Sequence, residues 1–154
     1  MSPRFVARGA GILILLLAVF AISRPALTQA STAADAVAAH ELLWFEVTAA
    51  VLAIGAVPDP AAVPIAGFKT AQARLETAIV RLINTTPPLP ALTDHLALLP
   101  FVQEVAAAAR AVVDAMEKND EPGVELGKDW LDDALAQLAA ALRQARALRA
   151  MHGA

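Results

Sequence analysis

Apolar residues recur at steps of three and four along four stretches of the chain, the spacing that lines one face of an α-helix. These stretches run from about residue 33 to 54, 67 to 84, 92 to 118 and 124 to 151. Proline-rich segments separate the first three, and several prolines close together disfavour a helix because each lacks an amide donor and has a fixed φ. The connection at residues 119–123 is short enough to make the last two helices antiparallel. The pattern predicts an all-α fold, an up-down four-helix bundle.

Pro100 interrupts the third stretch, and the sequence is compatible with two arrangements there. In one, a single helix kinks at the proline because one backbone hydrogen bond is lost. In the other, residues 92–98 form a separate turn, and the main helix opens at Leu99 with Pro100 near its first position. The apolar seam continues on both sides of Pro100, so it favours neither arrangement.

An uninterrupted apolar run at residues 9–23 precedes the four predicted helices and follows two arginines. A bilayer-spanning helix needs about 20 apolar residues, so this run fits the apolar region of a signal peptide better than a membrane span. Thr-Gln-Ala at 28–30 places small residues at the two positions that signal peptidase reads. Arg24 lies between the run and this site, and positive charge there leaves an uncleaved membrane anchor as the alternative.

Cleavage after Ala30 divides the chain into a signal peptide, residues 1–30, and a bundle domain, residues 31–154. We therefore expect an exported protein, periplasmic or extracellular, with membrane attachment only if the signal segment is not cleaved. Three of the 12 basic side chains lie in the removed segment, so nine basic and fifteen acidic side chains remain, a formal charge of −6. This balance argues against a nucleic-acid partner, which requires a basic face.

The residue types that carry nucleophilic, redox and thiolate chemistry are scarce in the predicted domain. The chain has no Cys and no Tyr, and Ser31 is the one serine beyond the signal segment. Absence of Cys excludes disulfides, thiolate metal sites and covalent haem attachment. The sequence also contains neither a G-x-S-x-G nucleophile motif nor a glycine-rich phosphate loop. We therefore predict a protein that is not an enzyme.

Two histidines are candidate ligands, although a structural role is the favoured interpretation of each. His40 lies on the apolar side of the first helix with Trp44 one turn further on, as expected for a half-buried side chain. His95 follows Thr93 and Asp94 near a helix start. It is either an imidazole paired with Asp94 and facing a ligand, or a first-turn residue beside a Thr93 cap.

The third histidine, His152, lies near the end of the fourth predicted helix. This position resembles that of an axial haem ligand in the cytochrome b562-like bundles, and the resemblance implies Met116 or Met151 as a possible second ligand. Those bundles supply that ligand as a methionine of the first helix, and residues 33–54 contain none. Paired Glu-x-x-His motifs, which di-iron bundles need, are also missing. We predict no cofactor and keep a small haem- or metal-binding carrier as the alternative.

The first predicted helix is the most apolar of the four and has two apolar stripes. The stripe expected to face the bundle interior contains His40, Leu43, Trp44, Val47, Val51 and Ile54. The second contains Leu42, Phe45, Ala49 and Leu52. Either both stripes form one wide buried face, or Phe45 and Leu52 anchor a second copy or another helical partner, because exposed apolar patches mark interfaces. We take Leu42, Phe45 and Leu52 as candidate partner-binding residues.

From Pro87 onward the chain resembles uncharacterised secreted helical proteins of bacteria. The likeness covers residues 87–152 and rests on Pro87-Pro88, His95, an Asn119-Asp120 turn and an alanine- and leucine-rich final helix. It implies an exported helical fold and carries no activity with it. Together, these observations predict an exported, non-enzymatic helical bundle that acts by protein binding or self-association.

Overall fold

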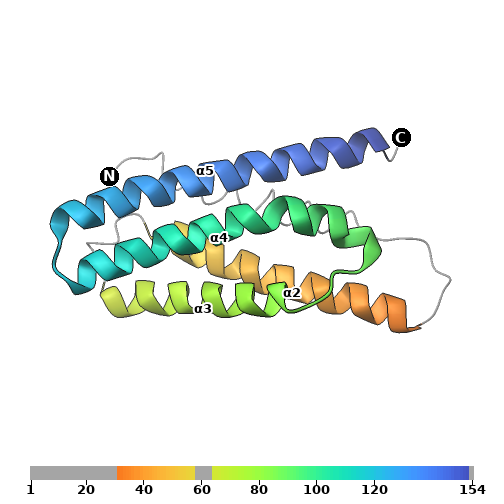
Figure 1. Ribbon diagram of the computed structural model, residues 1–154, viewed down its shortest axis with the longest axis horizontal. Coiled ribbons are helices and arrows are strands. Elements are labelled where there is room, and N and C mark those ends of the chain that lie inside the picture. Colours follow the sequence, from red (N-terminus) through yellow and green to blue (C-terminus); the bar gives the residue numbers. More distant parts are fainter. Residues whose placement is uncertain (1–30, 58–63, 153–154) are drawn as a thin grey trace.

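The computed structural model describes residues 31–57 and 64–152, which form four helices and no strand. In chain order these are α2 (Ser31–Gly55), α3 (Ile65–Ile83), α4 (Leu89–Glu117) and α5 (Glu121–His152). Successive helices run in opposite directions (Figure 1). The prediction of an all-α four-helix bundle is confirmed, and each helix begins and ends within three residues of its predicted bounds. The predicted signal peptide, residues 1–30, lies outside the described residues and stays a prediction.

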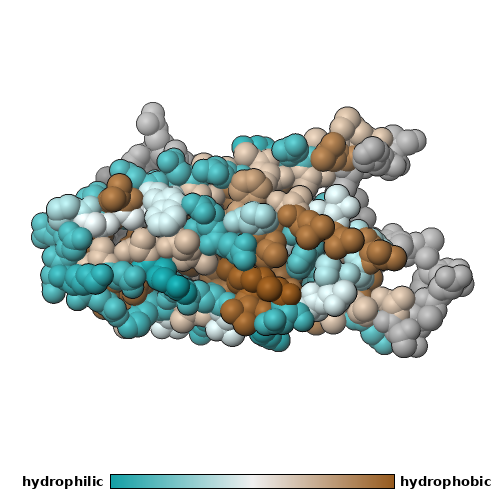
Figure 2. All heavy atoms as spheres, viewed as in Figure 1, coloured by the Kyte–Doolittle hydropathy of each residue, from teal (hydrophilic) through white to brown (hydrophobic). Residues whose placement is uncertain are grey.

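One apolar core joins the four helices, and its side chains are mainly leucine, valine, isoleucine and alanine. The inner stripe predicted for α2 is buried along its whole length, so that prediction is confirmed. Other apolar side chains remain at the surface. Figure 2 shows them over the N-terminal part of α4 and the C-terminal part of α3, where exposed large apolar residues are Val80, Ile83, Leu89 and Leu96.

Pro100 lies inside one helix, because α4 is continuous from Leu89 to Glu117. The separate turn at 92–98 is therefore wrong, and the axis of α4 bends within its N-terminal third (Figure 1). The helix begins earlier than predicted because Pro90 is accommodated in the first turn, where an amide donor is not needed. Thr93 consequently lies within the helix, and the predicted Thr93 cap is also wrong.

The reversal between α4 and α5 is built from two complementary helix ends. Asn119 has a left-handed φ of 53°, and its amide donates to the carbonyl of Met116 at 3.2 Å. The next amide, that of Asp120, donates to Ala115 at 2.9 Å, which completes a Schellman motif. Asp120 also caps α5, because its Oδ1 accepts the amide of Gly123 at 3.1 Å. This turn fixes α4 and α5 as an antiparallel pair.

Two helical segments, Ala33–Gly55 and Leu89–Glu117, are long and apolar enough to cross a bilayer by length and composition alone. In each, 44 % of the most apolar window is buried inside the bundle. Core helices of globular domains pass the same test, because one face of such a helix is packed against its neighbours. Packing within the bundle therefore accounts for part of the apolar character of both segments.

The pairing of α4 and α5 depends on close approach at Gly127. A Cβ at this buried position would lie 3.0 Å from Cγ2 and 3.1 Å from the backbone nitrogen of Val112. We expect Gly127→Ala to lower the free energy of unfolding by about 1–3 kcal/mol, because backbone atoms must move to accept the methyl group.

Gly67→Ala is the matched control, since Gly67 is exposed on α3 and an added Cβ would meet nothing within 4 Å. This change should raise the free energy of unfolding by about 0.5–1 kcal/mol, the ordinary gain of alanine over glycine in a helix. Urea denaturation followed by circular dichroism measures both. Stabilisation of both variants to the same extent would show that α4 and α5 do not meet closely at Gly127.

Candidate binding groove and buried histidine pair

The second apolar stripe of α2 divides into exposed and packed members. Leu42 is 64 % exposed and Phe45 is 58 % exposed, and Ala49 is exposed as well. Leu52 instead is half-buried and packs against the core. The wide buried face is therefore wrong for Leu42 and Phe45, and Leu52 contributes to stability at least in part. The role of these three residues in partner binding stays a prediction.

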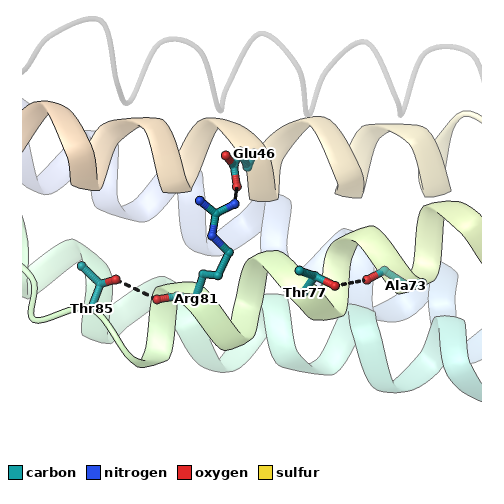
Figure 3. Close-up of polar contacts among 5 residues, drawn as sticks. All are labelled: Glu46, Ala73, Thr77, Arg81 and Thr85. Carbon is teal, nitrogen blue, oxygen red and sulfur yellow. Dashed lines mark hydrogen bonds and ion pairs between the residues drawn. The ribbon is translucent and has the colours of Figure 1, made fainter.

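Phe45 stands at the edge of a groove between α2 and α3 with a volume of about 850 Å³, which we call the α2–α3 groove. Its apolar lining is made mostly of small side chains: Ala49, Ala50, Ala53, Ala66, Ala73 and Ala78. Two threonines on α3 also line it. Thr70 and Thr77 donate their hydroxyl hydrogens to the carbonyls four residues earlier, at 2.7 and 2.9 Å, the latter drawn in Figure 3. Because these hydroxyls bond within their own helix, the lining is less polar than its composition suggests.

Three cations and one carboxylate line the same groove: Lys69, Arg74 and Arg81 with Glu46. Arg81 reaches from α3 to α2, where its guanidinium donates to Glu46 Oε2 at 2.6 Å (Figure 3). Lys69 pairs with Glu117 of α4, and the hydrogen bond raises the pKa of Lys69 above its ordinary value. Arg74 forms no hydrogen bond or ion pair with another described residue. The groove therefore has a net positive lining in a chain whose formal charge is −3.

A second exposed surface lies on the first half of α5. Leu126 is exposed, and Trp130 lies one helical turn further on, with 40 % of its surface exposed. The Trp130 indole donates to Glu104 of α4 at 2.6 Å, which holds the ring against the bundle. Asp129 and Asp133 are exposed on the adjoining side of the helix. We call these four residues, Leu126, Asp129, Trp130 and Asp133, the α5 acidic face.

The structure brings two of the three histidines together inside the bundle. His40 of α2 and His95 of α4 share a hydrogen bond of 3.1 Å between Nε2 of His40 and Nδ1 of His95. Both side chains are buried, with exposures of 2 % and 5 %, so the expectation of a half-buried His40 is wrong. The Trp44 ring meets both imidazoles edge to face, with ring centres 6.5 Å from His40 and 6.0 Å from His95. We call these three residues the histidine cluster.

Burial sets the charge state of the histidine cluster. Desolvation lowers the pKa of both imidazoles below 6.5, and the proximity of His95 lowers the pKa of His40 further. Both rings are therefore neutral at neutral pH, where one nitrogen of the pair donates and the other accepts. The expectation that His95 lies in a first turn is wrong, because α4 already begins at Leu89.

Two of the ligand arrangements considered for a metal or haem can be compared with the described residues. They contain no group of three or more His, Cys, Asp or Glu side chains placed to hold a metal ion. Met116 lies near the end of α4 that meets the start of α5, whereas His152 is the last residue of α5 (Figure 1). About 30 residues of helix separate these positions, roughly 45 Å at the α-helical rise. Met116 and His152 therefore cannot ligate one haem within this chain.

Comparisons with known proteins found no matching family model, no matching curated protein and no matching solved structure. The likeness of residues 87–152 to secreted helical proteins of bacteria thus rests on the residues alone. The α2–α3 groove, the α5 acidic face and the histidine cluster have to be interpreted from their own chemistry.

Proposed function

We propose that this protein is an exported, non-enzymatic helical module that acts by binding a helical segment in the α2–α3 groove. The observation that carries the proposal is that Phe45, which lines the groove, and Leu42, one turn before it on α2, remain exposed although the inner stripe of α2 already supplies the core. Burying a phenylalanine or leucine side chain contributes about 1.5–3 kcal/mol, so burial of these two residues by a partner would stabilise the complex.

The shape and lining of the groove support a helix as the bound element. Small-molecule sites enclose most of their ligand, whereas this groove is open along its outer side. Alanine rows on α2 and α3 allow the backbone of another helix to approach closely, as in helix-in-groove recognition. The groove extends from Ala66 to Arg81 along α3, about four helical turns. A helix of similar length fits this dimension and keeps its outer face in water.

The double variant Leu42→Glu with Phe45→Glu tests this function. Both residues are exposed, so we expect the variant to melt like the parent. We also expect it to lose partner capture or oligomer mass by more than about tenfold, because two carboxylates would be desolvated on binding. Circular dichroism measures the melt, and sedimentation of the protein purified from its own host measures partner capture and oligomer mass.

Leu89→Glu is the matched control, since Leu89 is more exposed than Phe45 and lies outside the groove. This variant should keep both the melt and the partner. Loss of the cooperative melt in the double variant would instead show that Leu42 and Phe45 belong to the core. Unchanged binding in the double variant, or equal loss in the control, would contradict a role for the groove.

A further inference from the structure

The α2–α3 groove and the α5 acidic face carry opposite charge, and both are exposed in the same chain. The groove lining combines three cations with one carboxylate. The α5 acidic face presents Asp129 and Asp133 beside the exposed Leu126 and Trp130. α3 and α5 lie at opposite edges of the bundle (Figure 1), so the two surfaces of one chain cannot meet each other.

We propose that the groove of one copy receives the α5 acidic face of a second copy, which joins protomers head to tail. The proposal rests on the proposed function, because it names the helix that the groove binds. Contact between two grooves would place cations against cations, and contact between two α5 faces would place carboxylates against carboxylates. Only the pairing of groove with α5 face brings opposite charges together, and like-charge contacts cost several kcal/mol.

Apolar contacts complement this charge pattern. Leu126 and Trp130 are one turn apart and share a side of α5, the spacing of anchor residues in helix-in-groove recognition. The alanine lining leaves room for such large side chains beside Phe45. Arg74 has no partner among the described residues, so a carboxylate of the second copy would gain an ion pair without breaking one.

The geometry predicts how assemblies grow. A head-to-tail contact uses two different surfaces, so each copy keeps one free groove and one free α5 face after pairing. Mass should therefore increase progressively with protein concentration rather than stop at a dimer, unless a ring closes. The association should also weaken as salt is added, because screening shortens from about 10 Å at 0.1 M to 3 Å at 1 M ionic strength.

Two variants that each damage one surface test the proposal. Arg74→Glu alters the groove without breaking an ion pair between described residues, and the double change Asp129→Lys with Asp133→Lys alters the α5 face. Each variant alone should associate at least about tenfold more weakly than the parent. An equimolar mixture should form a dimer, because the groove of one variant and the α5 face of the other are intact. Sedimentation velocity at low salt measures these masses.

Gln144→Lys is the control for added positive charge on α5, since Gln144 is exposed on the same helix about three turns beyond Asp133. It should associate like the parent. A monomeric parent at every concentration, or a mixture no heavier than the separate variants, overturns the proposal. The proposal is also overturned if each of the two variants, tested separately, still forms dimers. If the parent is monomeric while the double variant at Leu42 and Phe45 loses another captured partner, the head-to-tail contact fails and the proposed function stands.

Discussion

Acidification should destabilise this protein through the histidine cluster. The pKa of both His40 and His95 is lowered in the folded chain from the unfolded value of 6.5, so the unfolded chain binds protons more tightly. Their contribution to stability is complete above about pH 6.5 and is lost as pH falls from there through the folded pKa values. Each unit of pKa depression corresponds to about 1.4 kcal/mol, and the slope for two protons reaches about 2.7 kcal/mol per pH unit.

Urea denaturation at a series of pH values measures this loss. The double variant His40→Leu with His95→Leu is the matched control, because removing both partners of a buried hydrogen bond together is nearly neutral. Its stability near pH 8 should be close to that of the parent, and the histidine-dependent loss below pH 6.5 should disappear. Two results would contradict a neutral buried pair. One is a parent whose urea midpoint does not fall between pH 8 and the range below pH 6.5, and the other is a double variant that is as acid-sensitive as the parent.

Replacing Trp44 should cost more than any other single truncation at the histidine cluster. Trp44 is 2 % exposed and contacts both imidazoles, so Trp44→Ala leaves a cavity and removes the aromatic contacts. We expect a loss of about 3–5 kcal/mol, which is a large part of the 5–15 kcal/mol typical of a domain.

Trp130→Ala provides a control of identical chemistry at the surface. Trp130 is 40 % exposed and has one side-chain hydrogen bond, to Glu104. Its replacement should cost about 1 kcal/mol, the net value of such a bond, plus the packing of the buried part of the ring. Chemical denaturation followed by circular dichroism at 222 nm compares the two. Equal losses would show that Trp44 is not the central packing residue of the cluster.

The helices could be predicted from the sequence because burial imposes the helical period on each of them. The inner stripe of α2 illustrates this, since all its members from His40 to Ile54 are buried. The start of α4 could not be predicted, because prolines at 88 and 90 are typical of a loop and also fit the first turn of a helix.

The histidine cluster escaped prediction because its two imidazoles are 55 residues apart, and no local pattern relates them. A signal was nevertheless present. His95 continues the apolar seam of α4 backwards, three residues before Leu98 and seven before Val102, which are both buried. The predicted helix at 92–118 already contained this position, but one helix does not show which residue of another helix its imidazole meets.

The second apolar stripe of α2 was predicted from the sequence, but the groove beside it was not. That stripe left an interface at Phe45 open as one of two interpretations. The opposite wall of the groove comes from small residues of α3 that have no apolar signature of their own. The α2 stripe and the small residues of α3 lie on the two sides of one groove only because the two helices pack side by side, which neither segment specifies alone. The packing of Leu52 against the core could not be decided for a related reason, because it depends on neighbours that one helix does not specify.

Photo-crosslinking from the groove tests the central claim most directly. Phe45 can be replaced by p-benzoyl-phenylalanine with little change in shape, and its exposure of 58 % leaves the probe available to a partner. In protein produced by its own host, this probe should give one discrete product that maps to a helical segment of a second copy or of another protein. The same probe at Leu89, which is more exposed and lies outside the groove, should not give that product. No product from position 45, or the same products from both positions, would contradict the account of the α2–α3 groove as a binding site.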